Sequence, residues 1–139
     1  MSLQSFAYTD AGMSLLLAAA TGSRLTITKA VSGTGLVDPE AMAYQTDVSG
    51  EKHTCELLGI TAIGEGDSAA RKLPVRITGA ETAYELHQLG IYGRPDNSAQ
   101  DTLLMLAQDE RGVEVPAAAQ DAEFEIIFNV LIAISRDAK

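Results

Sequence analysis

The sequence predicts an α+β domain, a mainly antiparallel β-sheet or sandwich with one N-terminal helix. Three observations lead to this fold class. One early segment is rich in strong helix formers, later segments alternate apolar and polar residues as strands do, and short polar turns separate them. The alternation of strand and helix that builds a parallel sheet does not occur in the sequence.

The predicted helix lies in "TDAGMSLLLAAATGSR", residues 9–24. Thr9 or Asp10 is expected as its N-cap, and Gly22 is a suitable residue to end it. The leucines and alanines between them favour one short helix with a largely apolar surface. Gly12 lies in the first turn, where it weakens the helical propensity.

A first strand is predicted in "RLTITKAV", residues 24–31. The two-residue period places Leu25, Ile27 and Val31 on one buried face. The next stretch, "SGTGLVDPE" at residues 32–40, contains glycines and a proline and is expected to be a loop.

Two further strands are expected in the middle of the chain. "HTCELLGITAIG", residues 53–64, is rich enough in β-branched residues for a strand broken by Gly59. "KLPVRIT", residues 72–78, alternates regularly, and Pro74 within it implies an edge strand or a strand end. It is predicted to pair as a hairpin with "AYELHQLGIYG", residues 83–93.

The last two strands have the strongest patterns. "DTLLMLAQ", residues 101–108, fits a short buried strand, and "EFEIIFNVLIAIS", residues 123–135, keeps strict two-residue spacing. The inward set of this final strand is Phe124, Ile126, Phe128, Val130, Ile132 and Ile134. The opposite side also carries apolar residues, so Ile127, Leu131 and Ala133 are predicted to lie against another layer or another subunit.

The length of 139 residues fits a single domain over residues 1–139, with residues 1–5 expected as a disordered start or a cloning remnant. The formal charge of -9 repels phosphate backbones and anionic lipid, which argues against nucleic acid and membrane partners. No secretory signal or transmembrane run is evident in the sequence. The single cysteine, Cys55, excludes an intrachain disulfide.

Few residues suggest chemistry. His53 and Cys55 lie two apart on a predicted strand and would share a face, where they could bind a soft metal, but the only other histidine is His87. A structural histidine and an unreactive cysteine are therefore favoured. Glu85 and His87 also share a face, as an acid and base pair would, although solvent-facing alternation predicts the same placement. No catalytic residue, metal or cofactor is expected.

Three blocks of the sequence resemble a known family in their order. The first, residues 9–35, has a T-x-x-G helix start with Gly12, an alanine- and leucine-rich helix, an L-x-I-T strand, and a G-x-G with Gly33 and Gly35. The second, "ELHQLGIYGRPD", holds Gln88, Leu89, Gly90, Ile91 and Tyr92, and the third is "TLLMLAQDERGVEVP". Together they resemble phage tail-collar and tail-fibre proteins, in particular short tail-fibre-like proteins of prophages in Gram-positive gut bacteria.

The resemblance implies a structural part of a phage tail that joins a fibre or receptor-binding element to the baseplate, often as a homotrimer. It implies no enzymatic activity and no cofactor. The protein would be located in the virion tail and assembled in the cytoplasm of the bacterial host. The family usually has Glu where this chain has Gln88, so a buried carboxylate is in doubt here, although Gln can still hydrogen-bond to backbone. Gly90 is expected to let the chain bend or bulge where the alternation slips, between Leu86 in one register and Leu89 and Ile91 in the other.

Two other functions remain open from the residues. A carbohydrate-binding module for recognition of the host surface would need exposed aromatic residues in a groove, and Tyr44, Tyr84 and Tyr92 are the few available. A small hydrolase would need one cleft that contains His87 or Cys55 together with orienting groups.

Overall fold

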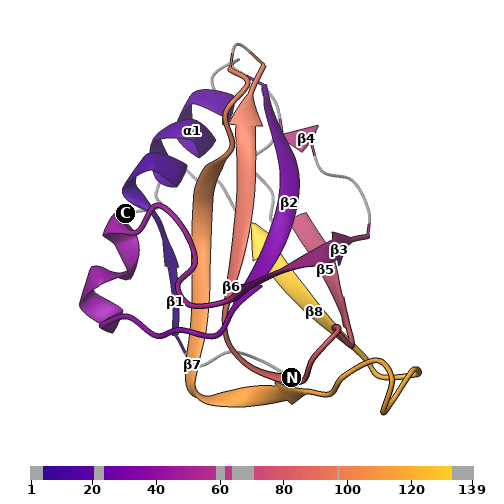
Figure 1. Cartoon of the computed structure of the whole chain (residues 1–139). Helices are drawn as coiled ribbons and strands as arrows, with labels where there is room; N and C mark the ends of the chain where they lie inside the picture. Colours follow the sequence, from indigo (N-terminus) through magenta and orange to yellow (C-terminus); the bar gives the residue numbers. More distant parts are fainter. Residues whose placement is uncertain (1–4, 21–23, 59–61, 64–70, 97, 133–139) are drawn as a thin grey trace.

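The computed structural model describes residues 5–20, 24–58, 62–63, 71–96 and 98–132. These residues form one α-helix, one short 3-10 helix and eight strands (Figure 1). In chain order they are β1 Ser5–Tyr8, α1 Asp10–Ala20, β2 Leu25–Gly33, η1 Pro39–Tyr44, β3 Lys52–Leu57, β4 Ala62–Ile63, β5 Arg71–Thr78, β6 Tyr84–Pro95, β7 Thr102–Val115 and β8 Glu125–Ile132.

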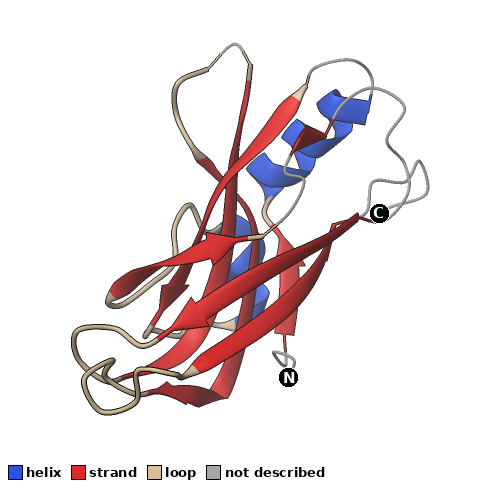
Figure 2. Ribbon diagram, turned by 90° about the vertical axis from the view of Figure 1, so that its right-hand side faces the viewer, coloured by secondary structure: helices blue, strands red, loops and turns tan. Residues whose placement is uncertain are grey.

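The strands form one sheet in the order β1-β7-β6-β2-β3-β5-β8, with β4 also paired to β2. Every pair of strands is antiparallel, so the predicted α+β class with one N-terminal helix is confirmed. The sheet curls strongly, and Figure 2 shows this from the side. Among the described residues, β3 and β5 are joined by two register pairs, Glu56↔Arg76 and Leu57↔Val75.

The curl encloses one large hydrophobic core, here called the inner core. α1 contributes Leu16 and Ala19 to it, and β6 and β7 contribute Leu86 and Leu104. Its β5 and β8 members are Leu73, Val75, Ile77, Phe128 and Ile132. Strands from both ends of the sheet therefore share the same core, as expected for a sheet that bends round on itself.

A second, smaller cluster covers the opposite face of the central strands and is here called the outer core. Its members are Val31, Met42, Val48, Tyr92, Leu103 and Leu106. Met42 and Val48 come from residues 34–51, here called the covering segment, which crosses the sheet and contains η1. The middle of β2, β6 and β7 is thus buried on both faces.

A β-bulge in β2 changes the predicted arrangement of that strand. The pairing with β6 shifts by one residue between Ile27 and Lys29. As a result Ala30 joins Ile27 in the inner core, whereas Val31 faces the outer core. The prediction that Val31 shares a face with Leu25 and Ile27 is wrong, because a bulge reverses the alternation beyond it.

The slip of alternation predicted between Leu86 and Leu89 is confirmed, because the pairing of β6 with β7 shifts between Leu86 and Gln88, and Leu86, Leu89 and Ile91 all lie in the inner core. The irregularity is not at Gly90 itself, which pairs with both neighbouring strands; a second shift lies between Ile91 and Tyr92. A Cβ atom on Gly90 would lie 2.7 Å from Val48 Cγ1 and 2.9 Å from Leu103 Cδ1. Gly90 therefore leaves room for the outer core instead of bending the strand.

The predicted hairpin between β5 and β6 does not form, because β5 pairs with β3 and β8. β5 is also not an edge strand, although it contains Pro74. The carbonyl of Pro74 accepts a hydrogen bond from Leu58 N at 3.0 Å, just beyond the last β3–β5 register pair. Since N and O of one strand residue point to the same side, the missing N–H of Pro74 removes no hydrogen bond from the pairing of β5 with β8.

The start of α1 is fixed by Thr9, which caps the helix as predicted. Its Oγ1 accepts a hydrogen bond from Gly12 N at 2.8 Å and donates to the carbonyl of Leu103. Thr9 N also donates to Leu104 O at 3.0 Å, which ties the helix start to β7. The preceding strand β1, which begins at Ser5 and pairs with β7, was not predicted because its four residues carry no clear period.

Gly12 allows α1 to lie directly on the backbone of β7. A Cβ atom at this position would lie 2.2 Å from the carbonyl oxygen of Leu104 and 2.5 Å from its Cα. Both are backbone atoms of a central strand and cannot move aside cheaply. The glycine that weakens the helical propensity is thus required for packing.

We predict that Gly12→Ala lowers the free energy of unfolding by about 2 kcal/mol. Ala is favoured over Gly in a helix by about 1 kcal/mol, but overpacking against a rigid neighbour costs about 1–3 kcal/mol, and here the contact is with backbone. Urea denaturation followed by circular dichroism measures the change. Ser14→Ala, at an exposed position of the same helix, is the control and should be neutral or slightly stabilising. Equal stability of the two variants would contradict the packing argument.

Candidate functional site

Gln88, Leu89, Gly90, Ile91 and Tyr92, here called the signature residues, lie in the middle of β6 and are all buried. Leu89 and Ile91 point into the inner core. Gln88, Gly90 and Tyr92 face the covering segment on the opposite side. The signature therefore divides by alternation into a core-forming half and a half that holds the covering segment.

Gln88 is fully buried, and its amide is hydrogen-bonded at both ends. Its Oε1 accepts from Ser49 N at 2.7 Å and from Ser49 Oγ at 2.9 Å, while its Nε2 donates to Gln108 Oε1 at 2.9 Å. Gln108 in turn pairs with both backbone groups of Val37: Nε2 donates to the carbonyl at 2.6 Å and Oε1 accepts from the N–H at 3.2 Å. Two buried amides thus hold both ends of the covering segment on the sheet, one at Val37 and the other at Ser49.

The G-x-G glycines let the two ends of the covering segment run against each other. A Cβ atom on Gly33 would lie 2.6 Å from Ser49 O, and one on Gly35 would lie 2.5 Å from Ser49 Oγ. Gly35 N donates to Ser49 O at 3.0 Å, and Gly50 turns the chain with a φ of 78°. These glycines serve close backbone approach and not the binding of a phosphate.

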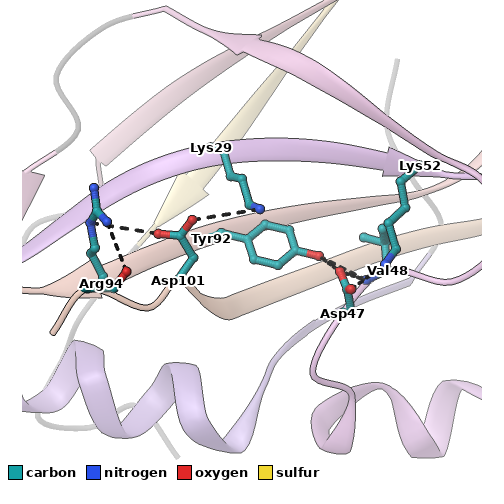
Figure 3. Close-up of polar contacts among 8 residues, drawn as sticks. Lys29, Asp47, Val48, Lys52, Tyr92, Arg94 and Asp101 are labelled. Carbon is teal, nitrogen blue, oxygen red and sulfur yellow. Dashed lines mark hydrogen bonds and ion pairs between the residues drawn. The ribbon is translucent and has the colours of Figure 1, made fainter.

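Tyr92 anchors the remaining part of the covering segment (Figure 3). Its hydroxyl donates to the carboxylate of Asp47 and accepts a hydrogen bond from Val48 N at 3.1 Å. The other carboxylate oxygen of Asp47 accepts from Lys52 Nζ. Lys29 Nζ lies 4.8 Å from the centre of the Tyr92 ring, within reach of a cation–π interaction.

The protonation states of Asp47 and Tyr92 agree with their role in holding the covering segment. Burial alone would raise the pKa of Asp47, but the hydrogen bonds from Lys52 and Tyr92, the Lys52 charge and the Val48 N–H outweigh it, and the pKa lies below its usual value. Burial, and then the hydrogen bond to Asp47, raise the pKa of the Tyr92 hydroxyl. Tyr92 therefore remains a protonated donor to an ionised carboxylate.

His53 and Cys55 share one face of β3, as predicted, but they are placed for packing. The His53 ring stacks on Tyr84, with ring centres 3.8 Å apart and planes inclined by 11°. His53 Nε2 lies 3.2 Å from Glu51 Oε1, a close approach that does not have hydrogen-bond geometry. Burial raises the pKa of the Cys55 thiol, which makes it a poor nucleophile. Among the described residues no cluster of His, Cys, Asp and Glu could hold a metal ion.

Glu85 and His87 contact each other, but both nitrogens of the imidazole are engaged. Nε2 lies 2.6 Å from Glu85 Oε1, and Nδ1 lies 2.8 Å from the carbonyl of Asp109. The ring lies beside Gly112, where a Cβ atom would be 2.8 Å from His87 Cε1. A pocket between β1, the covering segment and β7 contains no histidine or cysteine in its lining, which consists of Ser5, Leu36, Val37, Pro39, Gln108 and Glu110.

The three tyrosines considered for carbohydrate binding do not form an exposed groove. Tyr84 is 9% exposed and Tyr92 is 4% exposed, and both contribute to the cores. Only Tyr44, at 72%, presents its ring to solvent. Stacking on a sugar requires an accessible aromatic face, which Tyr84 and Tyr92 lack.

The contact of the second apolar side of β8 with another layer or another subunit stays a prediction. Phe128 and Ile132 are buried, whereas Ile127 is 42% exposed. Leu131 lies in β8 opposite Lys72, but its side chain is outside the described part of the structure, as is the whole of Ala133. The described residues contain no helix long and apolar enough to cross a membrane.

Sequence reasoning did not identify the partners of the signature residues. Gln108, Asp47, Val48 and Ser49 were not singled out, although they complete the contacts of Gln88 and Tyr92. One signal was available: Gln108 directly follows the apolar run "LLMLA" in a strand predicted to be buried, where an uncharged polar residue needs a partner.

We predict that Gln88→Glu lowers the free energy of unfolding by about 3 kcal/mol at pH 7, since it buries a charge and removes the donor to Gln108. Burial raises the folded-state pKa of the introduced carboxyl above its unfolded value. The loss should therefore be full above that raised pKa and shrink as the pH falls through it. Denaturant unfolding at several pH values measures this, with exposed Gln120→Glu as the control. A pH-independent difference would contradict the role of the amide donor.

A second prediction concerns Asp47. Because its folded-state pKa is lowered, the stability that it contributes is present above its usual pKa and is lost as the pH falls through the lower folded value. Asp47→Asn should be less stable than the natural chain at pH 7, by less than about 1 kcal/mol because the site is half exposed, and the two should converge in acid. Thermal unfolding of both proteins from neutral to strongly acidic pH checks this. Divergence in acid would contradict it.

Comparison of the chain with protein-family models, with curated proteins and with solved structures found no significant match.

Proposed function

We propose that this protein is a structural component of a phage or prophage tail that forms or joins part of the tail fibre, collar or baseplate. It acts through protein–protein assembly and not as an enzyme. The observation that carries the proposal is the use of the signature residues. Gln88, Gly90 and Tyr92 all face the covering segment; Gln88 and Tyr92 hydrogen-bond to it, and Gly90 leaves room for it.

The candidate chemical groups support a non-enzymatic role. The Cys55 thiol is partly buried with a raised pKa, and both ring nitrogens of His87 have partners within the chain. The two side chains have different neighbours, Cys55 contacting the carbonyl of His53 and His87 contacting Glu85. A nucleophile and base of the kind that hydrolysis needs are not assembled from these groups.

The surface offers features suited to assembly. Large apolar side chains are exposed at separate places on the described surface: Phe6 at 49%, Leu17 and Leu36 at 45%, Tyr44 at 72% and Ile127 at 42%. β1 and β8 are the two ends of the strand order, and end strands are common sites of contact with other chains. We therefore propose homo-oligomers and other tail or baseplate proteins as the partners.

The proposal predicts that the protein is found in tail particles. Prophage induction in the bacterium that carries the gene, followed by density-gradient purification, should recover the chain at a fixed ratio to the tail-tube protein. The Gly12→Ala chain serves as a folding-impaired control and should be depleted from the particles. Recovery of the natural chain only in the soluble fraction would contradict a tail role.

A further inference from the structure

The outer face of β5 and β8 has an ordered set of side chains. Leu73, Val75 and Ile77 of β5 point into the inner core, so the residues between them point outward, as do alternate residues of β8. The outward set is Lys72, Pro74, Arg76 and Thr78 on β5, with Glu125, Ile127 and Asn129 on β8. β8 ends the strand order, so this face lies at one margin of the sheet.

Charge is polarised along this face. At one end Arg76 lies between two carboxylates, with Nη1 2.9 Å from Glu56 Oε1 and Nε bonded to Glu125 Oε2. One positive and two negative charges leave this end with a net negative charge. At the other end the exposed Lys72 carries a positive charge. The face is therefore negative at one end and positive at the other.

Apolar surface begins at the level of Arg76 and extends toward Lys72. Ile127, paired with Arg76, is 42% exposed, and Pro74 in the next outward row is paired with Asn129. An isoleucine at the centre of an exposed sheet face gains free energy if another surface covers it.

When two copies of this face are placed together with their strands running in opposite directions, the negative end of one copy lies against the positive end of the other. Glu125 is paired with Thr78, and Thr78 lies six residues from Lys72, a separation of about 20 Å along the strand. A two-fold axis through the level of Val75 exchanges these ends between two copies. The same rotation brings Ile127 of one copy beside Pro74 of the other, so charge and apolar surface match together.

We propose that two copies of this chain pair through the outer faces of β5 and β8 about a two-fold axis, with Lys72 of each copy against Glu125 of the other. The pairing rests on the self-association proposed above, and it specifies the surface and the symmetry. A self-complementary face forms both of its charge contacts at once in a two-fold pair. Such pairing gives even-numbered assemblies, in contrast to the trimer that the family resemblance implies.

A charge exchange tests the pairing. Lys72→Glu places like charges at both ends of a homodimer, and Glu125→Lys does the same with the opposite sign. Each variant alone should dimerise at least about tenfold more weakly than the natural chain. In an equimolar mixture of the two variants, the introduced carboxylate of one chain meets the introduced ammonium of the other, and the unchanged Lys72 and Glu125 meet as well. The mixture should therefore recover the dimer.

Size-exclusion chromatography with light scattering at low salt measures the masses of the natural chain, each variant and the mixture. Glu40→Lys, an exposed charge change in η1, is the control and should leave the dimer unchanged. Because Glu125→Lys also removes an ion pair with Arg76, Ile127→Ser is included as an independent variant and should weaken the dimer without a charge change. Circular dichroism confirms that each variant is folded.

Three results would overturn the pairing: a natural chain that is monomeric at tens of micromolar, a trimeric mass, or a mixture that stays monomeric while both variants are folded. Any of these would leave the proposed tail function standing if the chain is still found in tail particles. Conversely, a charge-dependent dimer that never enters particles would support the pairing and overturn the tail function.

Discussion

The middle of the sheet is buried on both faces, and this depends on two glutamine side chains. Gln88 and Gln108 lie on neighbouring strands and hydrogen-bond to each other. Gln88 also hydrogen-bonds to Ser49 and Gln108 to Val37, near the two ends of the covering segment. If these amides were unpaired, the covering segment would leave polar groups buried without partners. The outer core, with Met42 and Val48 from the segment, can pack only while the segment is held in place.

The fold class and most elements were predictable, because hydrophobic period reports directly on which face is buried. α1 and β8 were placed correctly for this reason, whereas β7, predicted as a short strand over residues 101–108, continues to Val115. The hydrophobic period no longer predicts the buried face where the backbone departs from regular strand pairing. The bulge after Ile27 moved Val31 to the other face, and nothing in the local sequence marks that extra residue. The pairing of β5 with β8 is also non-local. The short connection between β5 and β6 led to the prediction of a hairpin between these two strands, which does not form.

The candidate site was predictable only in part. The signature residues were identified as a group, but their role came from segments more than thirty residues away in sequence, as in the contacts of Gln88 with Ser49 and of Tyr92 with Asp47. A single sequence holds little information about such pairs when the partner lies in an irregular loop. For the same reason Gly90 was assigned a bend, when the structure uses it to make room for Val48.

The position of Cys55 beside the junction of β3 and β5 has a practical consequence. Cys55, the single cysteine of the chain, is partly buried in β3 directly beside the first β3–β5 register pair. Local opening of this junction would expose the thiol, whereas the closed sheet shields it. The rate at which an alkylating reagent modifies Cys55 therefore reports how often the β5–β8 ribbon separates from the rest of the sheet, in the natural protein and without an introduced label.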